Sequence, residues 1–144
     1  RMKTEKQIRD ALSKEVRGVG FYELCEIDEA IGRLKELGYI DDRAYAERYL
    51  EILVGKRHGR RRVKDEMRRC GIAPMLAEDI IEGGYSPEKE RENAEALAQK
   101  ALDTGDLPAD RRRAAQRLSS RLAAKGYGYD MINSVVGELL RGVD

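Results

Sequence analysis

Apolar residues of this chain recur at an interval of 55 positions. The interval joins Ile8, Val63 and Leu118 on one helical turn, and Leu12, Met67 and Leu122 on the next turn. In the same way, Gly71, Ile72, Leu76 and Ile80 are followed by Gly126, Tyr127, Met131 and Val135. Similarity at a fixed period is typical of stacked units that bury their apolar faces only against a neighbour. The period therefore predicts a helical repeat protein.

Helix start and stop signals give this repeat protein a more definite form. Thr4 and Gln7 form a capping box, Asp41 or Asp42 caps a later helix, and glycines follow the apolar stripes. We expect an all-α fold of tandem three-helix repeats in an elongated curved array, with about eight helices. The predicted units are residues 1–38, 39–84 and 85–144, and the first is incomplete because it has only two helices. Its hairpin is expected to be longer around Gly18, before a second helix from about Glu26 to Leu37.

Composition agrees with amphipathic helices and limits the class of protein. Of the 144 residues, 38% are charged and 6% are aromatic, with no Trp, which suits solvated helices better than a sheet-rich core. No apolar run approaches the roughly 20 residues that cross a bilayer, and no secretory signal is present at the start. We expect a cytoplasmic monomer without a membrane segment. The first helix of the first repeat is missing, so the start at Arg1 and Met2 is open to interpretation as a trimmed fragment.

Charge is segregated along the chain although the net charge is only +1. Residues 56–69 carry 8 basic and 2 acidic side chains, and residues 111–144 carry 7 and 3. Residues 1–55 carry 10 basic and 12 acidic side chains, and residues 70–110 carry 3 and 10. The two positive blocks coincide with the middle helices of the second and third repeats. Stacking would therefore place basic helices along one side of the array.

The basic side chains of these helices are the candidate binding residues. They are Arg57, Arg60, Arg61, Arg62, Lys64, Arg68, Arg69, Arg111, Arg112, Arg113, Arg117 and Arg121. Helical spacing places Arg61, Lys64 and Arg68 on one face, and it does the same for the third-repeat arginines at 113, 117 and 121. Nucleic-acid phosphate or an acidic protein surface are the candidate partners. A merely solvated charged face is the alternative interpretation.

Catalytic patterns are sparse, so we expect neither an enzyme nor a cofactor or metal site. His58 is the only histidine, and it lies among basic residues without a carboxylate partner, which argues against a general base. We expect it at the surface or against a phosphate. The basic helices contain no aromatic pair that would stack bases.

Several stretches resemble one protein family. They are Ile27 to Arg43 with its Leu37-Gly38-Tyr39-Ile40-Asp41-Asp42 core, Tyr45-Ala46, Gly59 to Val63, Cys70-Gly71-Ile72 and Tyr129-Asp130-Met131-Ile132. Together they resemble the RecX family of bacterial recombinase regulators over nearly the whole chain. The resemblance implies tandem three-helix repeats that bind in the groove of the RecA filament on single-stranded DNA. It also implies inhibition of the filament's ATPase, strand-exchange and coprotease activities in DNA repair, recombination and the SOS response.

The chain departs from the family pattern in two places. Members often have a proline soon after the glycine that opens the basic helix, whereas Arg60 and Arg61 follow Gly59 here. The first repeat lacks its leading helix. By motif position the family's basic residues correspond to Arg57, Arg60, Arg62, Arg68 and Arg69, while the third-repeat arginines come from charge and spacing alone.

The sequence leaves the mode of action open. An elongated array is able to bridge successive protomers in the groove, or to cap a growing filament end, and it has cations for direct contact with single- or double-stranded DNA. The main alternative is a stand-alone helical DNA-binding protein, of helix-turn-helix type, with the helix over residues 60–69 in a groove. A helical scaffold for an unrelated acidic protein is a third interpretation.

Overall fold

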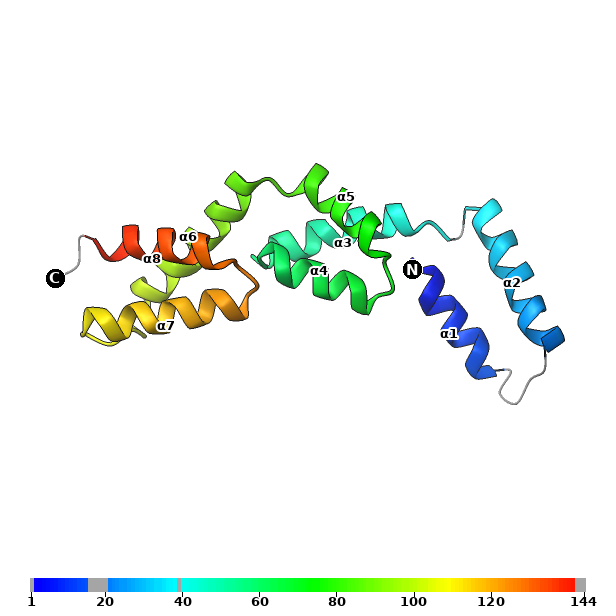
Figure 1. The fold of residues 1–144 in the computed structure, drawn as a ribbon, viewed down its shortest axis with the longest axis horizontal. Helices are drawn as coiled ribbons and strands as arrows, with labels where there is room; N and C mark the ends of the chain where they lie inside the picture. Colours follow the sequence, from blue (N-terminus) through cyan, green and yellow to red (C-terminus); the bar gives the residue numbers. More distant parts are fainter. Residues whose placement is uncertain (1, 16–20, 39, 142–144) are drawn as a thin grey trace.

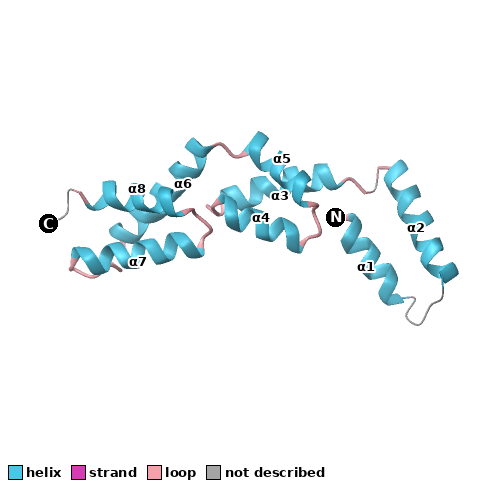
Figure 2. Ribbon diagram, in the orientation of Figure 1, coloured by secondary structure: helices cyan, strands magenta, loops and turns pink. Residues whose placement is uncertain are grey.

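The structure is a computed structural model that describes residues 2–15, 21–38 and 40–141, and every regular element in these ranges is an α-helix (Figure 2). The eight described helices are α1 (Glu5–Glu15), α2 (Phe21–Glu36), α3 (Asp42–Gly55), α4 (Arg60–Arg69), α5 (Pro74–Gly84), α6 (Pro87–Asp103), α7 (Arg111–Ala124) and α8 (Tyr129–Leu140). The predicted all-α fold with about eight helices is confirmed. The expected insertion around Gly18 lies outside the described residues.

Local side-chain caps begin four of the described helices, α1, α3, α6 and α7. The side chains of Asp41 and Ser86 accept hydrogen bonds from the backbone N–H groups of Ala44, at 3.0 Å, and Lys89, at 3.1 Å. Thr4 forms the expected capping box, since Gln7 N donates to Thr4 Oγ1 and Thr4 N donates to Gln7 Oε1. One prediction was wrong, because α2 begins at Phe21 and not near Glu26, although it ends close to its expected position.

The helices pack in three groups that follow one another along the long axis of the molecule (Figure 1). α1 packs on α2, while α3, α4 and α5 pack together, as do α6, α7 and α8. Each group has its own apolar core, centred on Ile31 in the first group, on Val63 and Met67 in the second, and on Leu118 and Leu122 in the third. This arrangement confirms an elongated tandem-repeat fold with a two-helix first unit. The boundaries at residues 38 and 84 stay a prediction.

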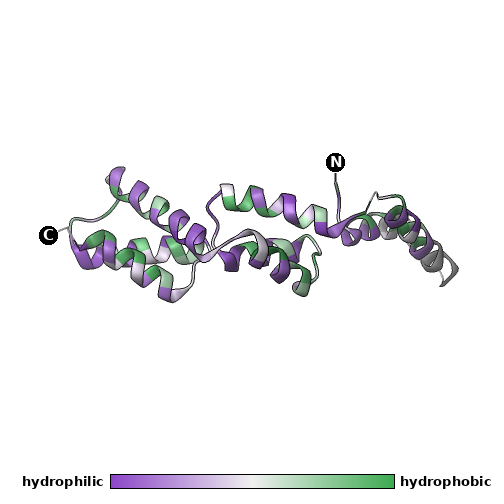
Figure 3. Ribbon diagram, turned by 90° about the horizontal axis from the view of Figure 1, so that it is seen from above, coloured by the Kyte–Doolittle hydropathy of each residue, from purple (hydrophilic) through white to green (hydrophobic). Residues whose placement is uncertain are grey.

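The residues of the 55-residue period lie in these cores. Val63, Met67, Leu118 and Leu122 are at most 1% exposed, and their first-repeat counterparts are partly buried. Each helix is amphipathic, with apolar and hydrophilic residues alternating along its ribbon (Figure 3). Within the described ranges, no helix has the length and apolar character that crossing a membrane requires.

Candidate functional site

The middle helices of successive repeats meet end to end. Thr4 Oγ1, at the start of α1, donates a hydrogen bond of 2.6 Å to the backbone oxygen of Cys70 at the end of α4. The backbone N–H of Gly59, at the start of α4, donates one of 2.7 Å to the backbone oxygen of Lys125 at the end of α7. Each partner in the second contact lies 55 positions after its counterpart in the first. The repeated contact therefore joins α7, α4 and α1 head to tail in one row, with α1 inclined to the other two helices (Figure 1).

Two glycines permit the close approach of α4 and α7. A Cβ atom on Gly59 would lie 2.5 Å from the carbonyl carbon of Gly126. Gly126 has φ +95°, and a Cβ atom there would lie 2.4 Å from the backbone nitrogen of Arg62. Only glycine adopts such a left-handed conformation without strain and leaves room for a neighbouring backbone. The end of α7 is thus seated directly against the first turn of α4.

Both basic helices of the row begin with three consecutive arginines. The triplets are residues 60–62 of α4 and residues 111–113 of α7, and neither first turn contains an acidic residue. The N-terminal end of a helix carries the positive end of its dipole, so each exposed cation there is unfavourable by about 0.3 to 1 kcal/mol. Stability does not explain the exposed members of these triplets, among them Arg61, Arg111 and Arg112. Their side chains are instead available to an anionic partner, although the backbone N–H groups of Gly59, Arg60 and Arg61 are already bonded within the molecule.

Ten of the twelve candidate cations lie on the outer surface and have at most weak intramolecular partners. Arg61, Arg111 and Arg112 have no carboxylate within 4.0 Å among the described residues. The others form contacts at the surface, in the pairs Arg62–Glu66, Lys64–Glu78, Arg68–Asp65, Arg69–Glu66, Arg113–Asp110 and Arg121–Asp106. Arg62 also donates to the backbone oxygen of Ala124 at 3.2 Å, and Arg117 donates to the backbone oxygen of Asp106. Exposed pairs of this kind contribute only about 0 to 1 kcal/mol each, so a polyanion can replace them.

Arg60 and Arg57 differ from the other candidates. The Arg60 guanidinium is only partly exposed and donates from Nε to the backbone oxygen of Tyr85 at 3.2 Å and from Nη1 to Glu82 at 3.2 Å. It therefore joins α4 to α5 and is not free for a partner. Arg57 has φ 61° and directs its guanidinium toward the side-chain oxygen of Asn93, at 3.4 Å. Its left-handed backbone turns the chain from α3 into α4.

A buried polar network fixes the second repeat against the third. The hydroxyl group of Tyr85 donates to the backbone oxygen of His58 at 2.7 Å and accepts from Asn93 Nδ2 at 3.0 Å. The hydroxyl group of Tyr127 donates to the backbone oxygen of Arg57 at 2.6 Å. Burial raises the pKa of both tyrosines, so they stay neutral donors at physiological pH. The network therefore fixes the position of α4 relative to the third repeat, and with it the positions of the two arginine triplets.

Glu90 is a second buried member of this junction. Its carboxylate, on α6, accepts a hydrogen bond of 2.8 Å from the backbone nitrogen of Arg60 and so caps α4 from the next repeat. Gly59, the residue before α4, has no side chain for this purpose. A carboxylate at this position also offsets the positive charge of the first turn. The sequence analysis did not predict that Glu90 and Asn93 are buried at this junction. The only sequence signal for their burial is that they lie beside the apolar stripe of α6.

The prediction for His58 was wrong. His58 is 8% exposed, and its Nδ1 atom is buried with no hydrogen-bond partner among the described residues. Burial lowers the pKa of its imidazole, and the nearby cations Lys125 and Arg62 lower it further. The expected contact between this side chain and a phosphate is therefore excluded by its burial. His58 belongs to the repeat junction.

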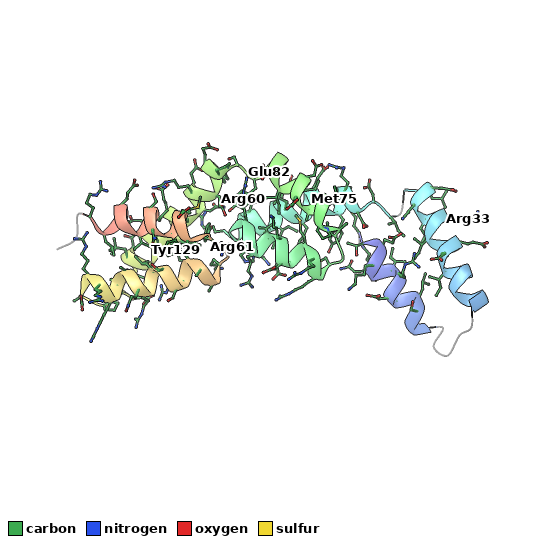
Figure 4. The ribbon with its side chains drawn as sticks, viewed as in Figure 1. Arg33, Arg60, Arg61, Met75, Glu82 and Tyr129 are labelled. Atoms are coloured by element: carbon green, nitrogen blue, oxygen red, sulfur yellow. The ribbon has the colours of Figure 1, made fainter. Side chains whose placement is uncertain are left out.

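One exposed aromatic residue adjoins the basic row and was not expected there. Tyr129 is 72% exposed at the start of α8. The backbone nitrogen of Arg61 donates to Gly126 O at 3.1 Å, which brings the turn before α8 against α4. Figure 4 shows Tyr129 and Arg61 on neighbouring parts of the ribbon. The only sequence signal for an exposed aromatic residue here is the position of Tyr129 directly after Gly128, at the start of a helix.

The fold and this site define a class: an all-α tandem-repeat protein with successive basic helices on its surface. A family model described as "RecX, second three-helix domain" matches residues 41–81. A curated "Regulatory protein RecX" from Streptomyces lividans is 33% identical over 145 residues, which cover 96% of this chain and 70% of that protein. The chain belongs to the RecX family of regulatory proteins.

Other relatives agree with this membership. The RecX protein of Clostridium botulinum is 34% identical over 140 residues, which cover 96% of this chain. The match spans 63% of the length of that relative. A crystal structure of RecX from Lactobacillus salivarius superposes with a TM-score of 0.78 at 26% identity, over 96% of this chain and 86% of that chain.

Proposed function

We propose that this chain binds in the groove of the RecA nucleoprotein filament and inhibits its ATPase, strand-exchange and coprotease activities during DNA repair and recombination. It acts by binding, without catalytic chemistry of its own, as a monomer in the cytoplasm. Membership of the RecX family supports a regulatory role. The chain spans less than two thirds of the length of most of the curated relatives it matches, so the activity of the whole protein is part of this proposal.

The observation that carries the proposal is the continuous row of middle helices. The contact of Gly59 with Lys125 aligns α7 and α4 so that their arginine triplets follow one another, and the contact of Thr4 with Cys70 adds α1 to the row. A polymer with regularly spaced anionic surfaces is a matching partner for such a row. Several weak contacts made at once on one rigid molecule add through effective concentration, so the array binds a filament far better than a single protomer.

The test is an ATPase titration of RecA on single-stranded DNA. The double variant Arg61→Glu with Arg112→Glu reverses two exposed cations of the row that have no ion-pair partner among the described residues, and we expect at least about a tenfold loss of inhibition. A double variant Arg43→Glu with Arg91→Glu reverses two arginines that pair with Asp79 and Glu138 away from the row, and it should inhibit normally. Equal inhibition by both variants, with unchanged circular dichroism, would remove the basic row from the mechanism.

The same titration separates the two modes of inhibition. Bridging along the groove requires an amount of protein that rises with filament length, because each molecule covers only a few protomers. Capping of a growing end requires far fewer molecules. Inhibition well below one molecule per RecA protomer therefore indicates capping, and inhibition that saturates near groove coverage indicates bridging.

Direct binding of DNA is the second candidate function, and the exposed Tyr129, which follows the turn that contacts α4, favours it. An aromatic face next to a cation is the arrangement that binds a stacked base and its phosphate. If free DNA is the main ligand, the logarithm of affinity falls with the logarithm of salt at a slope of about 0.7 to 0.9 per neutralised phosphate, whether or not RecA is present. If the filament is the ligand, affinity rises sharply when RecA and nucleotide are added.

A further inference from the structure

A hollow of about 380 Å³ opens between α6 and α7 beside the first turn of α4. This volume is within the range of roughly 300 to 1,000 Å³ that is usual for binding pockets. The side chains of Leu97, Leu118 and Leu122 form an apolar floor together with Ala98 and Ala101. The hollow therefore borders the third-repeat core, in which Leu97 is partly buried while Leu118 and Leu122 are at most 1% exposed.

The second repeat shows why this space exists. On α3 the buried residues are Ala46, Leu50 and Leu53, and on α6 the same spacing is occupied by Ala94, Ala98 and Ala101. The shift of 48 positions that relates these residues also relates Tyr49 to Leu97. The third repeat thus has smaller side chains at three corresponding positions. In the second repeat, Tyr49 extends across to α4, where its hydroxyl group lies 3.4 Å from Glu66.

The rim of the hollow is strongly positive. Arg62, Lys100, Arg121 and Lys125 line it, and Asp106 is the one acidic lining residue among those described. Asp106 lies 3.9 Å from Arg121, while neither lysine has a carboxylate within 4.0 Å in the part of the chain that the structure describes. An occupant with negative charge is therefore favoured over a neutral one. Its apolar part must match the aliphatic floor.

We infer that this hollow binds an acidic segment of a partner protein, which inserts an aliphatic side chain between α6 and α7 and places its carboxylates on the basic rim. Nucleic acid is disfavoured because no aromatic residue of the described ranges lines the hollow, and bases bind to single-strand sites mainly by stacking on aromatic rings. A short amphipathic segment in a groove between helices is a common mode of recognition. This inference goes beyond the proposed function, since it requires neither DNA nor a filament.

Fluorescence polarisation tests the inference with a short labelled peptide that carries two leucines flanked by glutamates. A matched peptide has serines in place of the leucines. We expect saturable binding of the leucine peptide to the full chain and at least about tenfold weaker binding of the serine peptide, because the buried apolar area is lost. Equal affinity for the two peptides would overturn the inference, since charge alone would then account for binding.

Variants of the hollow provide the structural test. Ala101→Leu introduces the side chain that the second repeat has at Leu53, fills the hollow and leaves every charge in place, so we expect at least about tenfold weaker peptide binding. Lys100→Glu on the rim should weaken binding as well, whereas Lys89→Glu, on the same helix but outside the hollow, should not. Unchanged affinity in a folded A101L protein would overturn the inference.

Two further controls keep these outcomes decisive. If A101L loses its helical circular dichroism, Leu97→Tyr serves as the hollow-filling variant instead. The second repeat has Tyr49 at the corresponding position. If a thymidine oligonucleotide displaces the peptide and itself loses affinity in the hollow-filling variant, nucleic acid is the occupant and the inference fails. RecA inhibition by the same variant separates the two proposals, since its basic row is intact and the proposed function predicts normal inhibition.

Discussion

At the scale of single residues, the junction of the second and third repeats depends on two glycines and on a set of buried hydrogen bonds. Gly59 and Gly126 bring two helix ends into contact because neither carries a Cβ atom. Around them, Tyr85 and Tyr127 donate to the backbone oxygens of His58 and Arg57 in the turn after α3. Asn93 adds a hydrogen bond to the backbone oxygen of Val54 near the end of α3. Buried groups of this kind are stabilising only when every one of them has its partner.

Gly126→Ala should destabilise the protein by more than about 1 kcal/mol, because φ is +95° and the new Cβ atom would meet the backbone of Arg62. Gly137→Ala is the matched control. Gly137 lies within α8, and a Cβ atom there would have no described neighbour within 4 Å, so this change should stabilise by about 0.5 to 1 kcal/mol. Urea denaturation measures both effects, and a loss of stability in the control alone would contradict the explanation.

His58 makes the stability of this junction depend on pH. Its pKa in the folded protein is lowered from the ordinary value of 6.5 by burial and by Lys125, Arg62 and Lys56, while Glu66 opposes the shift. The unfolded chain therefore binds the proton first as the pH falls. Stability is complete above pH of about 6.5 and decreases as the pH falls toward the folded-state pKa.

The expected result is a steeper loss of unfolding free energy between pH of about 7 and about 5 in the parent protein than in a His58→Gln variant. Glutamine has no titration in this range, so the difference between the two curves isolates the imidazole. Urea denaturation at closely spaced pH values supplies the curves. Parallel curves would show that His58 does not contribute to the pH dependence.

At the scale of helices, α4 and α7 begin in the same unfavourable way but are capped differently. Asp110 caps α7 locally by accepting a hydrogen bond of 3.0 Å from the backbone nitrogen of Arg112. The cap of α4 comes from Glu90, which is 30 residues away in the sequence. A helix with a basic first turn and a glycine before it therefore depends on the next repeat for its N-terminal stability.

Glu90→Gln tests this dependence with little change in side-chain volume. We expect a loss of about 1 to 2 kcal/mol, because a neutral amide is a poorer partner for the backbone nitrogen of Arg60 and for the helix dipole. Glu95→Gln changes an exposed residue of the same helix, paired with Arg91 at 3.8 Å, and should alter stability by less than about 0.5 kcal/mol. Similar losses in both variants, measured by urea denaturation, would argue against the capping role.

Prediction from the sequence succeeded where the signal is local or periodic. The 55-residue interval indicated the repeat architecture, and Gly71 and Gly126 end their helices with φ of +88° and +95°. The sequence did not predict which basic side chains are exposed. Arg60 turns inward to bond to the backbone oxygen of Tyr85, a contact between residues 25 positions apart. His58 was misplaced for the same reason, since its basic neighbours in the sequence say nothing of the helices that cover it. The hollow beside α6 likewise depends on three-dimensional packing of small residues.

At the scale of the whole molecule, the two junctions between repeats differ in strength. The second junction contains the buried tyrosines, Asn93 and Glu90. The first is held by Thr4 Oγ1, which donates to the backbone oxygen of Cys70, and by Glu5 N, which donates to Asp42 at 2.9 Å. Local unfolding should therefore begin in α1 and α2, because few buried contacts hold them to the rest.

Thr4→Val removes the hydroxyl group that donates to the backbone oxygen of Cys70 and accepts from Gln7 N in the capping box. The first junction and the start of α1 together are expected to lose about 1 to 3 kcal/mol. Hydrogen exchange measured by mass spectrometry should show faster exchange in α1 and α2 and no change in α6 to α8. Thr104→Val is the control, since Thr104 is exposed and its hydroxyl group bonds to nearby residues. Faster exchange throughout the chain would indicate one cooperative unit instead.

The end-to-end contacts of α7, α4 and α1 also give the molecule a sense of direction. All three helices are joined head to tail, so the two ends of the row are chemically distinct, as are the two ends of a protein filament. A molecule with two different ends binds to a filament with two different ends in only one orientation. The reversed orientation would place each helix end against groups of unfavourable charge. Copies that occupy one filament in succession would accordingly all face the same terminus.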